Sequence, residues 1–396
     1  MEPSKKELIL AVAVFLALPI VAELALRVAR VPFDAQLYGP DRELGWVLRP
    51  GASGLVSTET PQFVHINSHG FRDRERTYEK PANTFRIAIL GNSWTEALQL
   101  PLDQTYPAVL EKILNQHNCL AGRRVEILNF GVAGYSTAQE LLLLKEKVWS
   151  YHPDFVILAL YPARDIANNV RELNNAVTPE RSPYFLVRGD QLVLDDSFQA
   201  QPALQPAQIR LQSAGLWFDG HFRILQAINT LQRHAKIHVA MAAAKQRAEN
   251  AGMDNLEFAI YAPPSFPDMQ EAWKVTEHLL VAMRDEVRNH GAHFCLVTLA
   301  TRPQVIPDAA KRAELLKELG VADFSYADRR IAAFAARSSI EVVPLAPALS
   351  AYAESHHAYL NGFRPANFGT GHWNQIGHRL AAETIAASLC TAVGKE

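Results

Sequence analysis

Several common chemical signatures are missing from this chain of 396 residues. The three cysteines, Cys119, Cys295 and Cys390, lie far apart, so neither a disulfide framework nor the cysteine spacing of a zinc site is indicated. The formal net charge of −2 shows no sign of a nucleic-acid partner. We therefore expect no metal site and no nucleic-acid binding.

Sequence signals for cofactors are also absent. The first predicted strand-to-helix turn has neither a G-x-G-x-x-G pattern nor a P-loop lysine, which argues against nucleotide binding there. His234 and His238 have the i, i+4 spacing of a metal-binding pair, but no H-E-x-x-H glutamate lies between them. That pair is better explained as part of a solvated helical face, and we expect no cofactor.

The composition is that of a globular protein. Apolar residues make up 48% and charged residues 20% of the sequence, which argues against disorder. The chain is long enough for one large or two ordinary domains with a sizeable core. Cys295 lies in an apolar run and is expected to be a small core residue.

A nearly continuous apolar stretch runs from Leu8 to Leu26. About 19 residues are enough for a helix to cross a bilayer, and a secretory signal sequence has a similar size. No cleavage site of small residues follows, so a retained single-span anchor is favoured over a signal sequence or a buried helix. Lys5 and Lys6 precede the stretch and Arg27 and Arg30 follow it, so charge does not decide its orientation.

The sequence divides into an anchor, a polar segment and a main domain that contains an insertion. We predict an anchor at residues 1–33, a polar segment at 34–84, a main domain at 85–396 and an insertion at about 170–267. The polar segment should pack on the main domain, because Trp46 and Phe63 need burial. The insertion is expected to contain a hairpin around Arg188-Gly189-Asp190 and a long helix over residues 221–246, and to cover the site or bind a protein partner.

Short apolar runs alternate with helical periods in the main domain. The predicted strands are Phe85–Leu90, Val125–Phe130, Phe155–Leu160, Phe294–Leu299 and Ile340–Val343. The predicted helices are Tyr106–Gln116, Thr137–Trp149, Ala272–Asn289, Tyr326–Arg337 and Arg379–Leu389. This pattern predicts an α/β, three-layer flavodoxin-like fold with a five-stranded parallel sheet. Ligands of such sheets bind outside the carboxyl ends of the strands.

A serine follows the first of these strands. Gly91-Asn92-Ser93 ends an apolar run and precedes a helical pattern, an arrangement that exposes a hydroxyl beside unpaired backbone N–H groups. The G-x-S-x-G elbow works in a related way, but its second glycine is missing here. Taken alone, Asn92 and Ser93 also fit an ordinary helix cap.

Three further stretches lie where other strands end. Gly134 belongs to a glycine-containing turn after the second strand, and Arg164 to a turn after the third. His372 lies in a Gly-rich turn before the last helix, from which it can approach a serine at another strand end.

Together these blocks resemble the SGNH (GDSL-type) hydrolases, over residues 85–387. The resemblance implies that Ser93 is the nucleophile, Gly134 an oxyanion-hole donor and His372 the catalytic base. The stretch from Ile66 to Asp73 is similar to the upstream segment of membrane-anchored bacterial members. The order and spacing of the blocks carry the resemblance more than any single block.

The chain departs from the family pattern in two places. The asparagine that completes the family's oxyanion hole is replaced by Arg164, which can stabilise an oxyanion or close the site through an ion pair, and Asn168 or Asn169 is an alternative donor. The usual aspartate just before the catalytic histidine is missing, because Gly369-Thr370-Gly371 occupies those positions.

His372 therefore needs another group to orient it. The sequence leaves open a backbone carbonyl, the Thr370 hydroxyl, or a distant acid such as Glu354 or Asp165.

These residues predict a serine esterase or deacylase. Ser93 and His372 would act on an acyl ester, possibly on a cell-envelope glycan, with Gly134, Arg164, Asn92 and Asn168 around the oxyanion. Acyl transfer to a sugar hydroxyl is a close variant. The alternative is a catalytically degenerate, membrane-tethered binding or assembly subunit. In both cases we expect a single-pass membrane protein whose main domain is extracytoplasmic (periplasmic).

Overall fold

A parallel sheet of five strands forms the centre of the protein. The computed structural model describes residues 4–31, 33–117, 119–120, 122–174, 179–232 and 256–393. The strands of the sheet are β5 (Thr84–Gly91), β6 (Arg124–Gly131), β7 (Phe155–Leu160), β10 (His293–Thr298) and β11 (Glu341–Pro344). Their order is β11-β10-β7-β5-β6, and all neighbours are parallel. The order in which the strands are added to the sheet therefore reverses between β5 and β7. Ligands of such sheets bind at this switch point.

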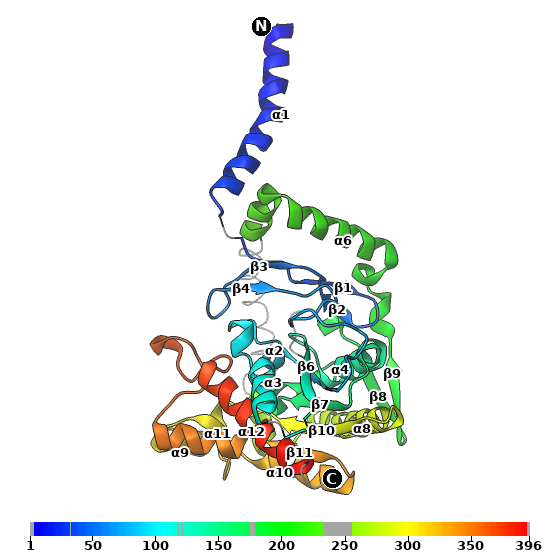
Figure 1. Ribbon diagram of the computed structural model, residues 1–396, viewed down its shortest axis with the longest axis vertical. Helices are drawn as coiled ribbons and strands as arrows, with labels where there is room; N and C mark the ends of the chain where they lie inside the picture. Colours follow the sequence, from blue (N-terminus) through cyan, green and yellow to red (C-terminus); the bar gives the residue numbers. More distant parts are fainter. Residues whose placement is uncertain are drawn as a thin grey trace.

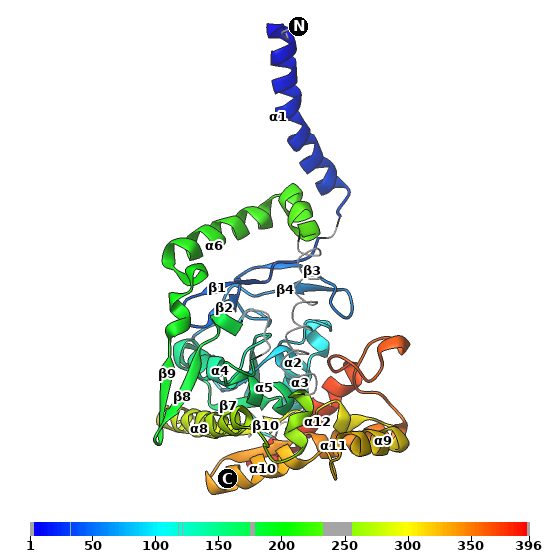
Figure 2. The same ribbon diagram turned by 180° about the vertical axis from the view of Figure 1, so that it is seen from behind.

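Helices cover both faces of this sheet (Figures 1 and 2). One group packs around α3 (Tyr106–His117) and α12 (Gln375–Val393), and the other around α4 (Thr137–Glu146), α5 (Pro162–Asn168) and α8 (Pro267–Asn289). Every residue of β5 and β7 is buried, which explains their continuous apolar runs. The predicted three-layer α/β fold is confirmed.

The remaining helices and hairpins lie around this frame. The hairpins are β1 (Tyr38–Asp41) with β2 (Gly45–Leu48), β3 (Ser53–Val56) with β4 (Gln62–His65), and β8 (Tyr184–Arg188) with β9 (Gln191–Asp195). The remaining α-helices are α1 (Lys5–Val28), α2 (Ser93–Glu96), α6 (Pro206–His221), α9 (Ala309–Leu319), α10 (Tyr326–Arg337) and α11 (Ala346–His356). Short 3-10 helices are Leu102–Gln104, Val148–Tyr151, Pro179–Arg181, Ser197–Ala200, Pro202–Leu204, Leu256–Tyr261, Pro303–Val305 and Pro365–Asn367.

The structure of the insertion agrees in part with what the sequence predicts. The predicted hairpin is present as β8 and β9, with Arg188 paired to Gln191 across the turn. Of the long helix predicted over residues 221–246, residues 223–232 are helical, and residues 233–246 lie outside the described residues. A separate helix, α6, precedes it and ends at His221, and the extended Phe222 lies between the two. His234 and His238 lie outside the described residues.

Helix α1 projects from the body and has no buried residue (Figures 1 and 2). By its length and apolar composition, α1 is a candidate membrane span. A signal sequence near the N-terminus has a similar length and composition. The anchor therefore remains a prediction.

A buried glutamate connects the polar N-terminal segment to the end of β5. Glu96 accepts hydrogen bonds from the Tyr38 hydroxyl at 2.8 Å and from the Ala133 N–H at 2.6 Å. Burial raises the pKa of Glu96 to about 7. Arg72 donates to the Glu96 carbonyl at 2.7 Å. The segment therefore holds the turn that carries Ser93 on one side.

Gly131 allows α2 to lie directly against β6. A Cβ atom at this position would come within 2.4 Å of the Glu96 backbone nitrogen, which cannot move without displacing α2. We expect Gly131→Ala to lower the free energy of unfolding by about 1–3 kcal/mol, as overpacking does, in chemical denaturation. Gly215→Ala is the matched control: it lies in open space on α6 and should raise stability by about 1 kcal/mol. Equal effects of the two substitutions would contradict the close approach.

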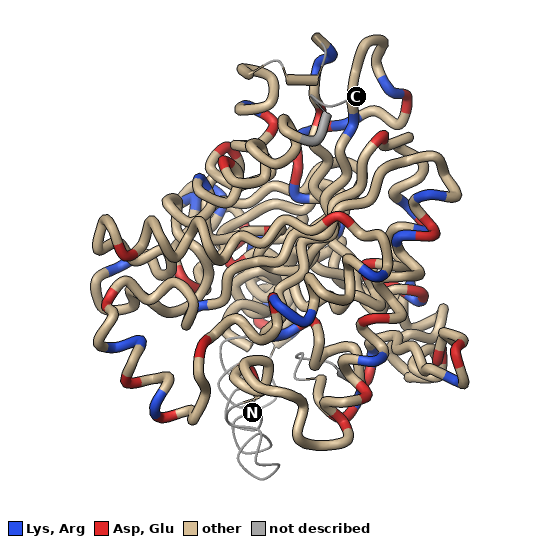
Figure 3. Tube along the Cα trace, turned by 90° about the horizontal axis from the view of Figure 1, so that it is seen from below, with Lys and Arg blue, Asp and Glu red and all other residues tan. Residues whose placement is uncertain are grey.

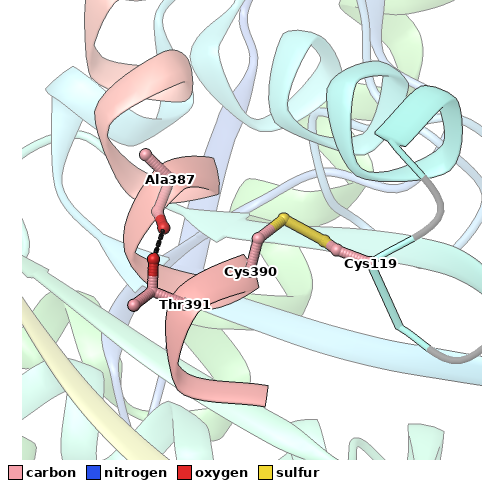
Figure 4. Close-up of a disulfide and its surroundings, with 4 residues drawn as sticks. All are labelled: Cys119, Ala387, Cys390 and Thr391. Atoms are coloured by element: carbon pink, nitrogen blue, oxygen red, sulfur yellow. Dashed lines mark hydrogen bonds between the residues drawn. A yellow bond between two sulfur atoms is a disulfide. The ribbon is translucent and has the colours of Figure 1, made fainter. Parts of the chain in front are cut away.

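Cys119 and Cys390 form a disulfide, so the expectation of no disulfide was wrong. The bond joins the chain after α3 to the last helix, α12, over a separation of 271 residues (Figure 4). Cys295 is a buried free thiol, as expected. Disulfides persist in oxidising compartments. The extracytoplasmic placement of the main domain stays a prediction.

Reduction of this disulfide should destabilise the protein. Closing a long loop restricts the unfolded chain, and losing such a bond typically costs about 2–5 kcal/mol. We expect a reductant to lower the Tm of the wild type and of Cys295→Ala, but not that of the double variant Cys119→Ala/Cys390→Ala. A wild-type Tm that does not respond to reductant would contradict the pairing.

Charged residues of both signs are interspersed along the trace (Figure 3). This mixing agrees with the formal net charge of −2, which is close to zero.

Candidate active site

Ser93 is placed at the start of α2 by the end of β5. Asn92 caps the helix, because its side-chain oxygen accepts a hydrogen bond from the Trp94 N–H at 3.0 Å. Gly91 is required at the turn, since a Cβ there would lie 2.1 Å from the Thr95 hydroxyl oxygen. As the first residue of the helix, Ser93 has a backbone N–H with no carbonyl partner one turn earlier. The serine thus presents both a hydroxyl and an amide donor.

His372 contacts this serine from a distant part of the chain. The Ser93 Oγ lies 2.8 Å from the His372 Nε2, although the two residues are 279 positions apart. The imidazole ring also packs against the Trp94 indole, with ring centroids 4.9 Å apart. The structure therefore brings the predicted nucleophile and the predicted base together at one edge of the sheet.

Glu59 completes the arrangement and was missed by the sequence analysis. It lies in the loop between β3 and β4, and its carboxylate accepts hydrogen bonds from the His372 N–H at 3.0 Å and from the His372 Nδ1. A carboxylate only accepts, so Nδ1 must carry the proton and Nε2 must be the acceptor for the Ser93 hydroxyl. Burial pushes the pKa of Glu59 up, but the bonds to His372 outweigh it and hold that pKa below its usual value.

Gly371 makes room for this carboxylate. A Cβ at Gly371 would lie 2.2 Å from Glu59 Oε2, and the backbone has a φ of +69° that glycine adopts without strain. The stretch that lacks the family's aspartate is therefore shaped to receive an acid from elsewhere.

The candidates that the sequence offered for orienting His372 have other partners. The Thr370 hydroxyl donates to the Asn367 carbonyl at 2.7 Å, and Glu354 forms an ion pair with Arg312. Asp165 accepts from the Tyr161 N–H at 2.6 Å. The group that orients His372 is therefore a distant acid, one of the alternatives that the sequence left open, but it is Glu59 of the N-terminal polar segment and neither Glu354 nor Asp165.

Gln99 is a second neighbour of the same ring nitrogen. Its side-chain amide lies 3.1 Å from His372 Nδ1, and Gln99 is buried. The atom placed there is the amide nitrogen Nε2, and Gln99 Oε1 has no hydrogen-bond partner among the described residues. Gln99 thus helps to fix the ring beside Glu59.

A cavity of about 340 Å³ opens beside Ser93. It is lined by all six residues that the sequence places in the site: Asn92, Ser93, Gly134, Arg164, Asn168 and His372. Trp94 and Tyr161 also line it, with ring centroids 4.6 Å apart. A cavity of this size suits a small ligand with one polar reacting group.

Two backbone N–H groups are candidates for holding an oxyanion. Ser93 and Gly134 line the same cavity from neighbouring strand ends, and Gly134 has a φ of +81°. Asn168 is buried at the cavity and its side-chain oxygen has no hydrogen-bond partner among the described residues. Arg164 lies at the exposed end of the cavity, so it is placed to meet the polar part of a ligand.

Asn92 has a different position from the other predicted donors. Its amide nitrogen donates to Asp165 Oδ1 at 2.6 Å, so its side chain braces the turn. Burial raises the pKa of Asp165 to about 7, although the Tyr161 N–H and the Asn92 amide oppose the shift. Asn92 therefore positions Ser93.

The outer part of the cavity carries an ion pair. Arg302 follows β10 and donates to Glu257 Oε1 at 2.6 Å, and both residues line the cavity. The pair therefore places two charged groups in the lining of the cavity. Within the described residues no group of three or more His, Cys, Asp or Glu residues could hold a metal ion.

His378 has a structural role. Its Nδ1 accepts a hydrogen bond from the Tyr106 N–H at 3.1 Å, and burial lowers the pKa of the imidazole to about 3. It stays neutral and connects α3 to α12.

Comparisons with known proteins give one curated relative and a set of similar solved structures. No family model matches the chain. A segment of 96 residues is 24% identical to an arylesterase of Vibrio mimicus, covering 22% of this chain and 46% of that protein. The chain thus spans about half the length of this curated relative.

Several solved structures are similar to this chain over most of its length. A lipolytic protein of the G-D-S-L family from Desulfitobacterium hafniense is 12% identical, with 76% of this chain and 98% of that chain covered and a TM-score of 0.34. A lipase/acylhydrolase from Enterococcus faecalis is 12% identical, with 78% and 96% covered and a TM-score of 0.38. An acetyl xylan esterase is 13% identical, with 77% and 100% covered and a TM-score of 0.39. The chain resembles SGNH (GDSL-type) hydrolases in its sequence blocks and in its five-stranded parallel sheet.

Proposed function

We propose that this protein is a serine esterase in which Ser93, His372 and Glu59 act as a triad. The observation that carries the proposal is the continuous set of contacts from the Ser93 hydroxyl through the imidazole of His372 to the Glu59 carboxylate. This is the order of roles that activates a serine, whatever the order of the residues in the chain.

In the proposed reaction Ser93 Oγ attacks the carbonyl carbon of an ester. His372 Nε2 takes the hydroxyl proton, while Glu59 stabilises the imidazolium that forms. The carbonyl oxygen becomes an oxyanion held by the N–H groups of Ser93 and Gly134. His372 then gives its proton to the departing alcohol, which leaves an acyl-serine. Water, activated by the same imidazole, releases the acid and restores the serine.

We propose an ester of a small acyl group with a polar alcohol, such as an O-acetyl group on a cell-envelope glycan. The cavity volume suits a small acyl group, and the aromatic rings of Trp94 and Tyr161 offer a surface on which a sugar can stack. Arg164 and the Arg302–Glu257 pair supply donors and acceptors for hydroxyl groups. If a sugar hydroxyl replaced water in the second step, the same site would transfer the acyl group.

The test is hydrolysis by the full-length protein in detergent. We expect p-nitrophenyl acetate to be cleaved with a higher kcat/KM than the octanoate and decanoate esters, and acetylated oligosaccharides to release acetate. Preference for the long acyl chains would overturn the proposed substrate while leaving the esterase in place. Lack of hydrolysis of every ester, in protein that is folded by its Tm, would overturn the esterase itself.

A further inference from the structure

Helix α6 presents an apolar stripe that the described part of the chain leaves exposed. The side chains at i, i+4, i+7 and i+11 of this helix are exposed: Ala207, Leu211, Ala214 and Phe218. The exposed fraction of Leu211 is 65%. Residues at this spacing share one face of a helix. A helix on the surface of a globular domain normally turns such a face inward.

The opposite face of α6 contacts the body of the protein. Ile209, Gln212 and Leu216 are partly buried, and Asp219 is fully buried, again at helical spacing. The Leu216 carbonyl accepts a hydrogen bond from Arg49 at 2.9 Å. The orientation of α6 is therefore fixed by contacts, and the apolar stripe points away from the domain.

The stripe lies beside the foot of α1. In Figures 1 and 2, α6 runs across the end of α1 from which the body begins. Glu23, near the end of α1, accepts hydrogen bonds from the Arg223 N–H at 3.1 Å and the Ile224 N–H at 3.0 Å. Arg27 donates to the His221 carbonyl. The apolar surface of α1 and that of α6 are thus adjacent.

We propose that α6 lies in the surface layer of the same bilayer that α1 crosses, with its apolar stripe among the lipids. A membrane explains two neighbouring apolar surfaces with one partner, since the plane of a bilayer meets both a spanning helix and a helix lying across its foot. Trp217, 53% exposed beside the stripe, is a residue type that prefers this layer. Arg210, exposed on the flank of the stripe, is placed to meet lipid phosphates. The proposal rests on α1 spanning the membrane and not on the esterase activity.

This placement sets the direction in which the active site faces. Helix α2, which begins at Ser93, and the β3–β4 hairpin, which carries Glu59, lie on the side of the main domain that faces α6 and α1 (Figures 1 and 2). A protein held by both α1 and α6 would keep this side toward the membrane. The esters that reach it are then those displayed close to the membrane surface.

Trp217 serves as a built-in reporter of the contact. The other five tryptophans are buried or partly buried: Trp46, Trp94, Trp149, Trp273 and Trp373. The full-length protein is reconstituted into phosphatidylethanolamine–phosphatidylglycerol vesicles with or without brominated acyl chains, which quench indoles on contact. The Trp217 contribution is the difference between wild type and Trp217→Phe. We expect it to lose about half or more of its intensity, because an interfacial helix buries its apolar face about 5–10 Å deep.

A pair of variants separates insertion of α6 from mere nearness to the anchor. Leu211→Asp/Phe218→Asp should abolish the quenching, whereas Ser213→Asp, exposed on the flank of the same helix, should retain it. Both should keep wild-type hydrolysis of a soluble ester. Unquenched Trp217 in the wild type, or quenching that survives the double substitution, overturns the proposal. Protection of Trp217 from iodide without quenching by bromine, together with cross-linked dimers, would assign the stripe to a second copy and also overturn it.

Discussion

A Glu59→Gln variant is expected to lose about 10⁴-fold in kcat, the cost of removing the orienting acid in a serine protease. The amide can no longer stabilise the imidazolium, and it can hold the wrong tautomer of His372 toward Ser93. The KM for p-nitrophenyl acetate should change little, because Glu59 contacts the histidine and does not line the cavity. Steady-state kinetics measures both constants, and the Tm shows whether the hairpin still folds.

Glu354→Gln is the matched control for this prediction. Glu354 is one of the two acids that the sequence offered, but in the structure it pairs with Arg312 on the surface. Its loss should leave kcat within a few fold of the wild type. A Glu59→Gln variant with wild-type kcat, or a Glu354→Gln variant that is inactive, would remove Glu59 from the mechanism.

A Ser93→Ala variant is expected to lose about 10⁶-fold in kcat, as loss of the nucleophile does in subtilisin. The remaining residues still bind substrate but have no atom to attack the carbonyl. The variant should fold, since Ser93 is partly exposed and alanine fits the first turn of a helix. Ester hydrolysis, with Thr370→Ala as a control for an exposed hydroxyl near the site, measures the effect.

The same variant separates the two functions that the sequence allows. If the protein were a non-catalytic assembly subunit, Ser93→Ala would preserve its biological role in a complemented deletion strain. The proposed esterase requires that the role be lost with the activity. Complementation by an inactive Ser93→Ala protein would favour the subunit.

The sequence predicted the sheet closely because its strands are buried on both faces. The run Phe155–Leu160 is apolar throughout, and β7 has the same bounds. The boundaries of β5 and β6 each extend one residue beyond the prediction at both ends, where Thr84 and Arg124 add polar residues to an apolar run. At these strands the burial seen in the fold matches the local apolar pattern of the sequence. That pattern alone is therefore sufficient to predict them.

The acid of the triad could not be predicted in the same way. Glu59 lies 313 residues before His372, in a short polar loop whose composition resembles any surface turn. What placed it there is tertiary: the burial of Tyr38 and Arg72 against Glu96 holds the N-terminal segment over the site. The one local signal was negative, since Gly371 stands near the position of the missing aspartate and leaves space for another carboxylate.

The disulfide and the break at Phe222 that separates α6 from the next helix were missed for similar reasons. Cys119 and Cys390 are 271 residues apart, and their pairing follows from the packing of α3 against α12. The helical pattern around residue 221 is continuous in sequence, but Phe222 is extended and breaks it where the chain meets the foot of α1. Contacts between distant segments decided both outcomes.

The most direct test of the central claim is covalent labelling of the wild-type protein with a fluorophosphonate, followed by peptide mass spectrometry. We predict a single adduct on Ser93, formed far more slowly in Glu59→Gln and absent from Ser93→Ala. An adduct on another serine, or no adduct on folded protein, would contradict the proposal that His372 and Glu59 activate Ser93.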